Sequence, residues 1–142
     1  MKLRKSESGI TVMELVVIIV VLSVVVAITY PKFRTMLYQS REGQTKANLG
    51  DIRGAIAIYY SDNFGLFPSD DGKPETRLAD ALIPQYIKKI PYVELSHLFK
   101  KKLNTVNDRL DNGGDWVYQT LNGLVYVNAT HMDTEGKPIS GW

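Results

Sequence analysis

Residues 9–31, GITVMELVVIIVVLSVVVAITYP, decide how the rest of the sequence is read. Between residues 15 and 28 every side chain is apolar except that of Ser23. As an α-helix, the stretch from Ile10 to Tyr30 would be about 32 Å long, which is close to the thickness of a bilayer's hydrocarbon core. The sequence therefore predicts a helix that can span a membrane.

Charge is distributed unevenly around this stretch. The basic residues that precede it are Lys2, Arg4 and Lys5. Because positively charged flanks stay in the cytoplasm, we expect the N-terminus on the cytoplasmic side and everything after Tyr30 on the other side. The whole chain has 17 basic and 15 acidic residues, so it has no overall field for nucleic acid and no specific nucleic-acid partner is predicted.

Three other interpretations of the apolar stretch remain open. A secretory signal peptide has a shorter apolar core, of about 7–15 residues, and a small-residue cleavage site, for which the sequence Ala27-Ile28-Thr29-Tyr30-Pro31 is poor. An ordinary single-pass anchor explains the length but leaves Glu14 unexplained. A buried helix of a soluble protein would need cover on all sides, more than the rest of this chain can supply.

Glu14 is the informative residue of the stretch. A carboxylate inside a membrane costs up to about 3 kcal/mol, and such residues usually have a partner. Residues 6–31 contain neither Lys nor Arg, so the nearby positive charge would be a new amino terminus made by cutting just before Ile10. We hypothesise that the amine of one chain pairs with Glu14 of another, which would neutralise both charges in an apolar setting.

The run from Gly9 to Glu14, after a short basic leader and before an apolar stretch that ends at Pro31, resembles the type III signal of type IV pilins. The pseudopilins of type II secretion systems carry the same signal. The resemblance implies that prepilin peptidase cuts after Gly9 and methylates the amine of Ile10. It also implies that Glu14 pairs with a neighbouring subunit's amine and that Pro31 kinks the helix.

Two residues depart from the family pattern. Ile10 replaces the usual phenylalanine, a variation that should leave cleavage intact. Ser23 stands where many members have glycine, which bears on how far the helix melts locally in a filament.

The resemblance implies a structural subunit that is inserted in the inner membrane and then polymerised through its N-terminal helix. Its expected partners are further copies of itself, prepilin peptidase, an inner-membrane assembly platform, minor pilins and, before assembly, membrane lipid. The product would be an extracellular pilus or, as an alternative, the periplasmic pseudopilus of a type II secretion system. A further alternative is a membrane-anchored binding module that never polymerises. The absence of cysteine argues against the disulfide-bounded head loop of many pilins.

The expected fold is α+β, with one long helix packed on a small head that contains an antiparallel sheet. The predicted parts are a leader (1–9), a membrane-spanning half of the helix (10–30), an amphipathic half (31–62) and a head (63–142). The amphipathic half shows apolar residues at spacings of three and four. These are Leu49, Ile52, Ile56 and Tyr59, and the stop signals that follow are Asp62, Asn63 and Gly65.

In the head, the pair Asn122-Gly123 between β-rich runs predicts a two-residue hairpin turn. The residues expected on the buried face of that hairpin are Trp116, Tyr118, Val125 and Val127. Residues 138–142 are a candidate third strand, residues 68–75 are a loop by composition, and residues 78–87 predict a short helix broken at Pro84.

No motif for catalysis is present, so the chain is not predicted to be an enzyme. Its two histidines, His97 and His131, have no metal-ligand spacing, and no phosphate-binding glycine loop occurs. The lysines Lys100, Lys101 and Lys102 are expected on a solvated turn, with a docking role as the alternative.

No cofactor is predicted, although calcium is an alternative because it takes several oxygen ligands from flexible loops. The first candidate cluster is Asp108, Asp111, Asn112 and Asp115. The second is Asp70, Asp71 and Glu75.

Overall fold

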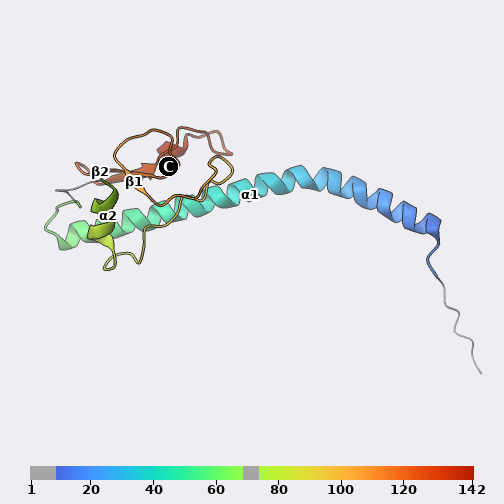
Figure 1. The fold of residues 1–142 in the computed structure, drawn as a ribbon, viewed down its shortest axis with the longest axis horizontal. Coiled ribbons are helices and arrows are strands. Elements are labelled where there is room, and N and C mark those ends of the chain that lie inside the picture. The colour runs from blue at the N-terminus through green and yellow to red at the C-terminus, as the bar shows by residue number, and fades with distance from the viewer. Residues whose placement is uncertain (1–8, 69–73) are drawn as a thin grey trace, which may run out of the picture. The chain divides into compact units, whose positions relative to one another are not determined.

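The computed structural model describes residues 9–68 and 74–142 of the chain (Figure 1). It divides into two compact units, Met1–Met36 and Leu37–Trp142, of which the second is called the head unit below. The elements in chain order are α1 (Val12–Asp62), α2 (Pro74–Leu82), β1 (Val106–Asn107), β2 (Trp116–Gln119), β3 (Leu124–Val127) and the 3₁₀ helix η1 (Ile139–Gly141). The predicted α+β class is confirmed.

Helix α1 has nearly the bounds that the sequence predicts. It ends at Asp62, and the two residues Phe64 (φ 56°) and Gly65 (φ 79°) then adopt left-handed backbone angles that cannot continue the helix. Pro31 lies inside the helix, where its carbonyl accepts a hydrogen bond from the Thr35 hydroxyl at 3.3 Å. The kink expected near Pro31 stays a prediction.

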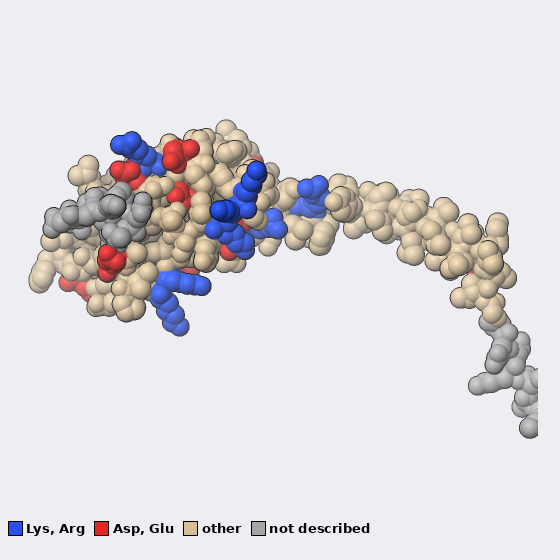
Figure 2. Space-filling view, in the orientation of Figure 1, with Lys and Arg blue, Asp and Glu red and all other residues tan. Residues whose placement is uncertain are grey.

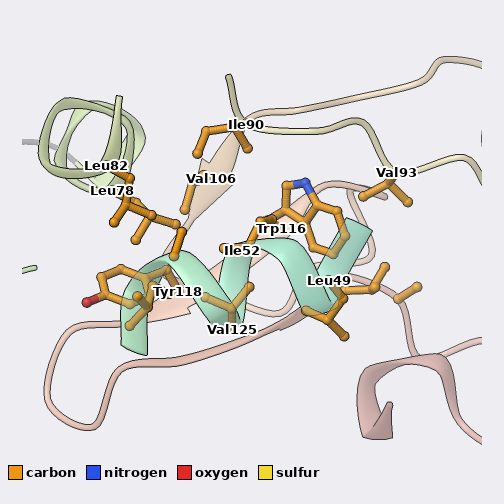
Figure 3. Packing of buried hydrophobic residues seen from close by; sticks show 14 of the residues in the cluster. Leu49, Ile52, Leu78, Leu82, Ile90, Val93, Val106, Trp116, Tyr118 and Val125 are labelled. Carbon is orange, nitrogen blue, oxygen red and sulfur yellow. The ribbon is translucent and has the colours of Figure 1, made fainter. Parts of the chain in front are cut away.

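The second half of α1 buries one face in the head unit, as its spacing predicts. Leu49, Ile52 and Ile56 are at most 3% exposed, and they pack against the sheet and α2 (Figure 3). The indole of Trp116 lies over this helix face, fully buried, and its N–H donates to the carbonyl of Pro91 at 2.8 Å. The second half of α1 is thus one wall of the core of the head.

The sheet has three strands in the order β1-β2-β3, and it is mixed rather than antiparallel throughout. β2 and β3 are antiparallel, but β1 pairs with β2 in parallel, with Val106 opposite Trp116. Two residues are too short a strand for any alternating pattern to appear in the sequence. Two neighbouring parallel strands normally need a connection of a dozen or more residues. Here residues 108–115 alone connect β1 to β2, and the side chain of Asn128 holds this loop through hydrogen bonds.

The hairpin expectation was right about the buried face and wrong about the turn. Gln119 pairs with Leu124, so the connection has four residues, and the amide of Gly123 donates to the carbonyl of Gln119 at 2.9 Å. The register differs from that of a two-residue turn by an even number, which leaves the same side chains on the same face. The predicted inward residues Trp116, Tyr118, Val125 and Val127 are all buried.

The predicted third strand at residues 138–142 is wrong. Pro138 forms an isolated bridge with Met132, and residues 139–141 then turn as η1, which places Ile139 fully inside the core. The amides of Gly141 and Trp142 donate to the carbonyls of Pro138 and Ile139 at 2.9 and 3.2 Å, so this backbone bonds within a turn and does not continue the pairing of a strand.

The short helix after the loop also has different bounds. α2 begins at Pro74 and ends at Leu82, because Pro84 cannot donate a backbone hydrogen bond inside a helix. Of the predicted loop at residues 68–75, positions 69–73 lie outside the described residues.

Substitution of Gly123 tests whether the hairpin connection requires a residue without a Cβ atom. Gly123 has φ +68°, and an added Cβ would lie 2.3 Å from ring carbons of Phe67. We expect Gly123→Ala to destabilise the head by clearly more than the roughly 1 kcal/mol of backbone strain alone, measured as the shift of a urea unfolding midpoint. Gly136→Ala is the matched control, because its φ is +79° and no atom lies within 4 Å of the added Cβ. Equal losses in the two variants would contradict the clash.

Candidate assembly segment

The N-terminal end of α1 is closed by a reciprocal pair of hydrogen bonds. The amide of Glu14 donates to the Thr11 hydroxyl at 3.2 Å, and the amide of Thr11 donates to the Glu14 carboxylate at 3.4 Å. This is a capping box, in which the residue before the helix and the third helical residue each satisfy one backbone N–H of the other. The helix accordingly begins at Val12, while Gly9 and Ile10 precede it and Ile10 is exposed.

Reasoning from the sequence missed this cap. The signal was present, since threonine followed three residues later by glutamate before an apolar run is the signature of a capping box. Glu14 therefore has a second task in addition to the charge pairing inferred for it. It holds the first turn of the helix next to Ile10.

Between Glu14 and Lys32 the helix offers only uncharged side chains (Figure 2). No part of its most apolar 18-residue window is buried, and by length and composition this helix could cross a membrane. The hydroxyls of Ser23 and Thr29 donate to the carbonyls of Val20 and Val25 at 2.7 and 2.8 Å, so neither needs a partner outside the helix. An apolar surface of this size needs either lipid or protein against it.

The chain is similar to a curated protein, the fimbrial protein EcpC of Eikenella corrodens, with which it is 29% identical over 69 residues. The chain is similar to a fimbrial protein. The match covers 49% of the chain and 44% of EcpC, so the chain spans less than half the length of this relative. No family model matches the chain, and no solved structure matches it.

The structure brings together two of the three aspartates of the first calcium cluster. Asp111 and Asp115 each accept a hydrogen bond from the amide nitrogen of Asn128, at 2.6 and 2.7 Å. Asp108 is exposed instead and lies 3.9 Å from Arg109. Among the described side chains, those of residues 9–68 and 78–142, no three of His, Asp or Glu are placed so that they could hold a metal ion. Asp70 and Asp71 lie outside the described residues, as does the side chain of Glu75.

The bonds around Asn128 explain why this acidic loop is ordered. Asn128 is fully buried, and its side-chain oxygen accepts the backbone N–H groups of Asp111 and Asn112. The other carboxylate oxygen of Asp115 accepts hydrogen bonds from Thr105 and Asn107. N–H and O–H donors thus satisfy the carboxylate of Asp115, a common arrangement for a buried polar group.

Three charged residues of α1 bind residues 133–142, called the C-terminal segment below, and one of them also binds strand β3. Glu42, Lys46 and Arg53 follow one another along the helix. Glu42 is 4% exposed and accepts the amide and hydroxyl of Thr134 at 3.0 and 2.6 Å. Arg53 donates to the carbonyls of Val125 and Trp142. No pattern in the sequence indicates these contacts, because the two residues of each pair lie about 70–90 positions apart in the chain.

Lys46 is the middle member of this set. Its ammonium lies 3.4 Å from a carboxylate oxygen of Asp133 and 4.5 Å from the centre of the Trp142 ring. The indole N–H of Trp142 donates to the same oxygen at 3.0 Å. We call the contacts of Glu42, Lys46 and Arg53 with this segment the C-terminal clasp.

The hydrogen bonds of Asp133 predict that the stability of the head decreases at low pH. Hydrogen bonds from the amide of Lys137, with those from Trp142 and the amide of Glu135, lower the pKa of Asp133 from 3.8 to about 2. Stability from this depressed pKa is complete above pH 4 and is lost as the pH falls towards 2. We expect urea midpoints to fall over that range, and to fall less in Asp133→Asn. An unchanged slope in that variant would contradict the assignment.

The lysine turn lies at the surface, as predicted. Lys100 and Lys101 are exposed, and Lys102 is paired with Glu94. Of the two histidines, His131 is exposed and its ring meets that of Phe99 edge to face at 5.5 Å. His97 is largely buried.

Proposed function

We propose that the chain is a structural subunit of a type IV pilus-like filament, processed between Gly9 and Ile10 and polymerised through the first half of α1. The observation that carries the proposal is the uncovered apolar segment that begins at a capped glutamate. The similarity to a fimbrial protein supports a pilin-like structural role. The α+β fold on one long helix is consistent with that role and with the absence of a catalytic motif.

Assembly would exchange lipid for contacts between helices. In lipid the apolar side chains of residues 15–28 are already covered, so polymerisation gains little from hydrophobicity and must be directed by packing and polar pairing. The carboxylate of Glu14 would supply that direction, because an unpaired charge among apolar helices is costly. Pairing with the Ile10 amine of a neighbouring copy would fix the axial register.

The remaining partners and the topology follow from the same proposal. The leader would stay in the cytoplasm and the head unit would lie outside it, in a single-pass inner-membrane precursor. Prepilin peptidase would process the precursor, and an inner-membrane assembly platform with minor pilins would receive it. Calcium binding by Asp108, Asp111 and Asp115 is an alternative role of the head, and a calcium-dependent shift in unfolding temperature would test it.

A type II secretion pseudopilin is the second candidate function. The observation that favours it is the absence of cysteine, since a disulfide-bounded head loop is expected of many pilins. Neighbouring genes separate the two candidates. A retraction motor would indicate a pilus, and an outer-membrane secretin with a full secretion set would indicate a pseudopilus.

Mass spectrometry of the N-terminus tests the proposal. In shed filaments we expect the chain to begin at Ile10 and to carry one methyl group on its amine. The matched control is a Gly9→Leu precursor, which should remain uncut and membrane-bound. A membrane-anchored module that never polymerises predicts an uncut native N-terminus and a monomer after detergent extraction, and that pair of results would overturn the proposal.

A further inference from the structure

The loop of residues 94–103 rests on the first turns of α1 in the head unit. The amide of Glu94 donates to the Thr45 hydroxyl at 3.0 Å, and the imidazole of His97 stacks on the ring of Tyr38, with centroids 4.6 Å apart and planes 20° from parallel. The side chain of His97 is only 10% exposed. This histidine is therefore enclosed between its own loop and the helix.

The two ring nitrogens of His97 lack good hydrogen-bond partners in this enclosure. Its Nδ1 is buried without a hydrogen-bond partner, and no other buried side-chain nitrogen or oxygen among residues 9–68 and 78–142, whose side chains the structure describes, shares that condition. Its Nε2 lies 3.8 Å from the Glu42 carboxylate, too far for a hydrogen bond. Both oxygens of Glu42 also accept hydrogen bonds from Thr134. A protonated ring would therefore bury an Nδ1–H without an acceptor, and the Glu42 carboxylate near Nε2 would offset only part of that cost.

The charges that face His97 act in opposite directions. Burial lowers the pKa of His97 below 6.5 and outweighs Glu42, which raises it, while Arg41 lowers it further. Tyr38 is the other titratable group of α1 at the ring. On the loop itself, Glu94 is paired with Lys102, and on the C-terminal segment the residue that meets Glu42 is Thr134, which carries no charge.

We propose that His97 is a proton-sensitive latch, which holds the 94–103 loop on α1 while the imidazole is neutral and releases it when the imidazole gains a proton. Release would uncover the helix face around Glu42 and Thr45, which the loop and the C-terminal clasp otherwise share. The inference does not depend on filament formation, because every contact it uses lies inside the head unit.

The sign of the effect follows from linkage. The open loop exposes His97 to water, where it binds a proton near pH 6.5, whereas the closed loop resists protonation. Acidification therefore favours opening, by up to about tenfold in the opening equilibrium for each pH unit below 6.5. The dependence stops once the pH falls below the pKa of the closed state.

Hydrogen exchange of the full chain in detergent micelles tests the latch. Exchange rates of amides in residues 94–103, divided by the intrinsic rate at each pH, should rise several-fold between pH 7 and pH 5.5. In His97→Phe, which keeps a ring to stack on Tyr38 but cannot titrate, the corrected rates should not change with pH. His131→Phe is the matched control, because it removes the chain's other histidine from an exposed position and should leave the rise intact.

A second measurement keeps the proposal falsifiable if His97→Phe fails to fold. The pKa of His97 in the native chain can be followed by NMR from its ring proton resonances and should lie below 6.5. A His97 pKa at or above 6.5 would overturn the latch. A rise in exchange that persists in His97→Phe would also overturn it.

Discussion

Replacing Glu14 by alanine is expected to reduce the yield of shed filaments by at least about tenfold. Coupling energies of close, desolvated charge pairs are of the order of 1.5–7 kcal/mol, and about 1.4 kcal/mol already corresponds to tenfold in an equilibrium constant. The substitution would leave the Ile10 amine of each incoming subunit without its counter-charge among apolar helices. Filament yield, quantified against membrane-bound subunit, is the measurement.

The capping box requires a more discriminating pair of variants, because alanine at position 14 removes both the charge and the cap. Glu14→Gln retains the ability to accept the Thr11 N–H and so keeps the cap while losing the charge. Thr11→Val does the opposite: it removes the hydroxyl that accepts the Glu14 amide and leaves the carboxylate in place. Loss of the cap alone costs about 1 kcal/mol of helix stability.

We expect Glu14→Gln to be nearly as defective as Glu14→Ala, and Thr11→Val to retain most of the filament yield. The reverse order would show that Glu14 acts through the helix start and not through charge. Normal filaments from Glu14→Ala would contradict both roles. Cleavage after Gly9 should persist in all three variants, which separates an assembly defect from a processing defect.

Replacing Trp116 by alanine is expected to give the largest loss of stability in the head unit. Its indole is fully buried against the face of α1 that carries Ile52, so its removal leaves a cavity in the centre of the core. Truncating a buried Trp costs about 3–5 kcal/mol, which lowers the midpoint temperature by more than about 10 °C in a domain of this size. Near-UV circular dichroism during heating of the full chain in detergent follows the loss.

Two control variants separate the contributions of that residue. Trp116→Phe keeps most of the apolar volume but leaves the Pro91 carbonyl unpaired, for an expected loss of about 1–3 kcal/mol. Leu121→Ala removes a large side chain that is 97% exposed and should change stability by no more than about 0.5 kcal/mol. If Trp116→Ala unfolds no earlier than Leu121→Ala, the core does not depend on the indole.

Local patterns predicted the parts of this fold that local physics controls. The bounds of α1, its buried stripe at Leu49, Ile52 and Ile56, and the inward face of the β2–β3 hairpin follow from spacings of three, four and two residues. The cap at Glu14 follows equally well from a four-residue signature that reasoning from the sequence overlooked. The cleavage and methylation assigned to Gly9 and Ile10 stay predictions, since the contacts of the folded chain do not bear on them.

The sequence by itself determined that this chain has one long helix whose residues 15–31 are uncharged, because the hydropathy of an 18-residue window needs no distant partner to be read. Only the tertiary structure decided that β1 is parallel to β2, that residues 139–141 turn into the core, and that Glu42, Lys46 and Arg53 fasten the C-terminal segment. These features join residues far apart in the chain, and the free energy that selects them comes from burial and hydrogen bonds formed only after folding. The enclosure of His97 belongs to the same class, since no spacing along the chain places it against Tyr38.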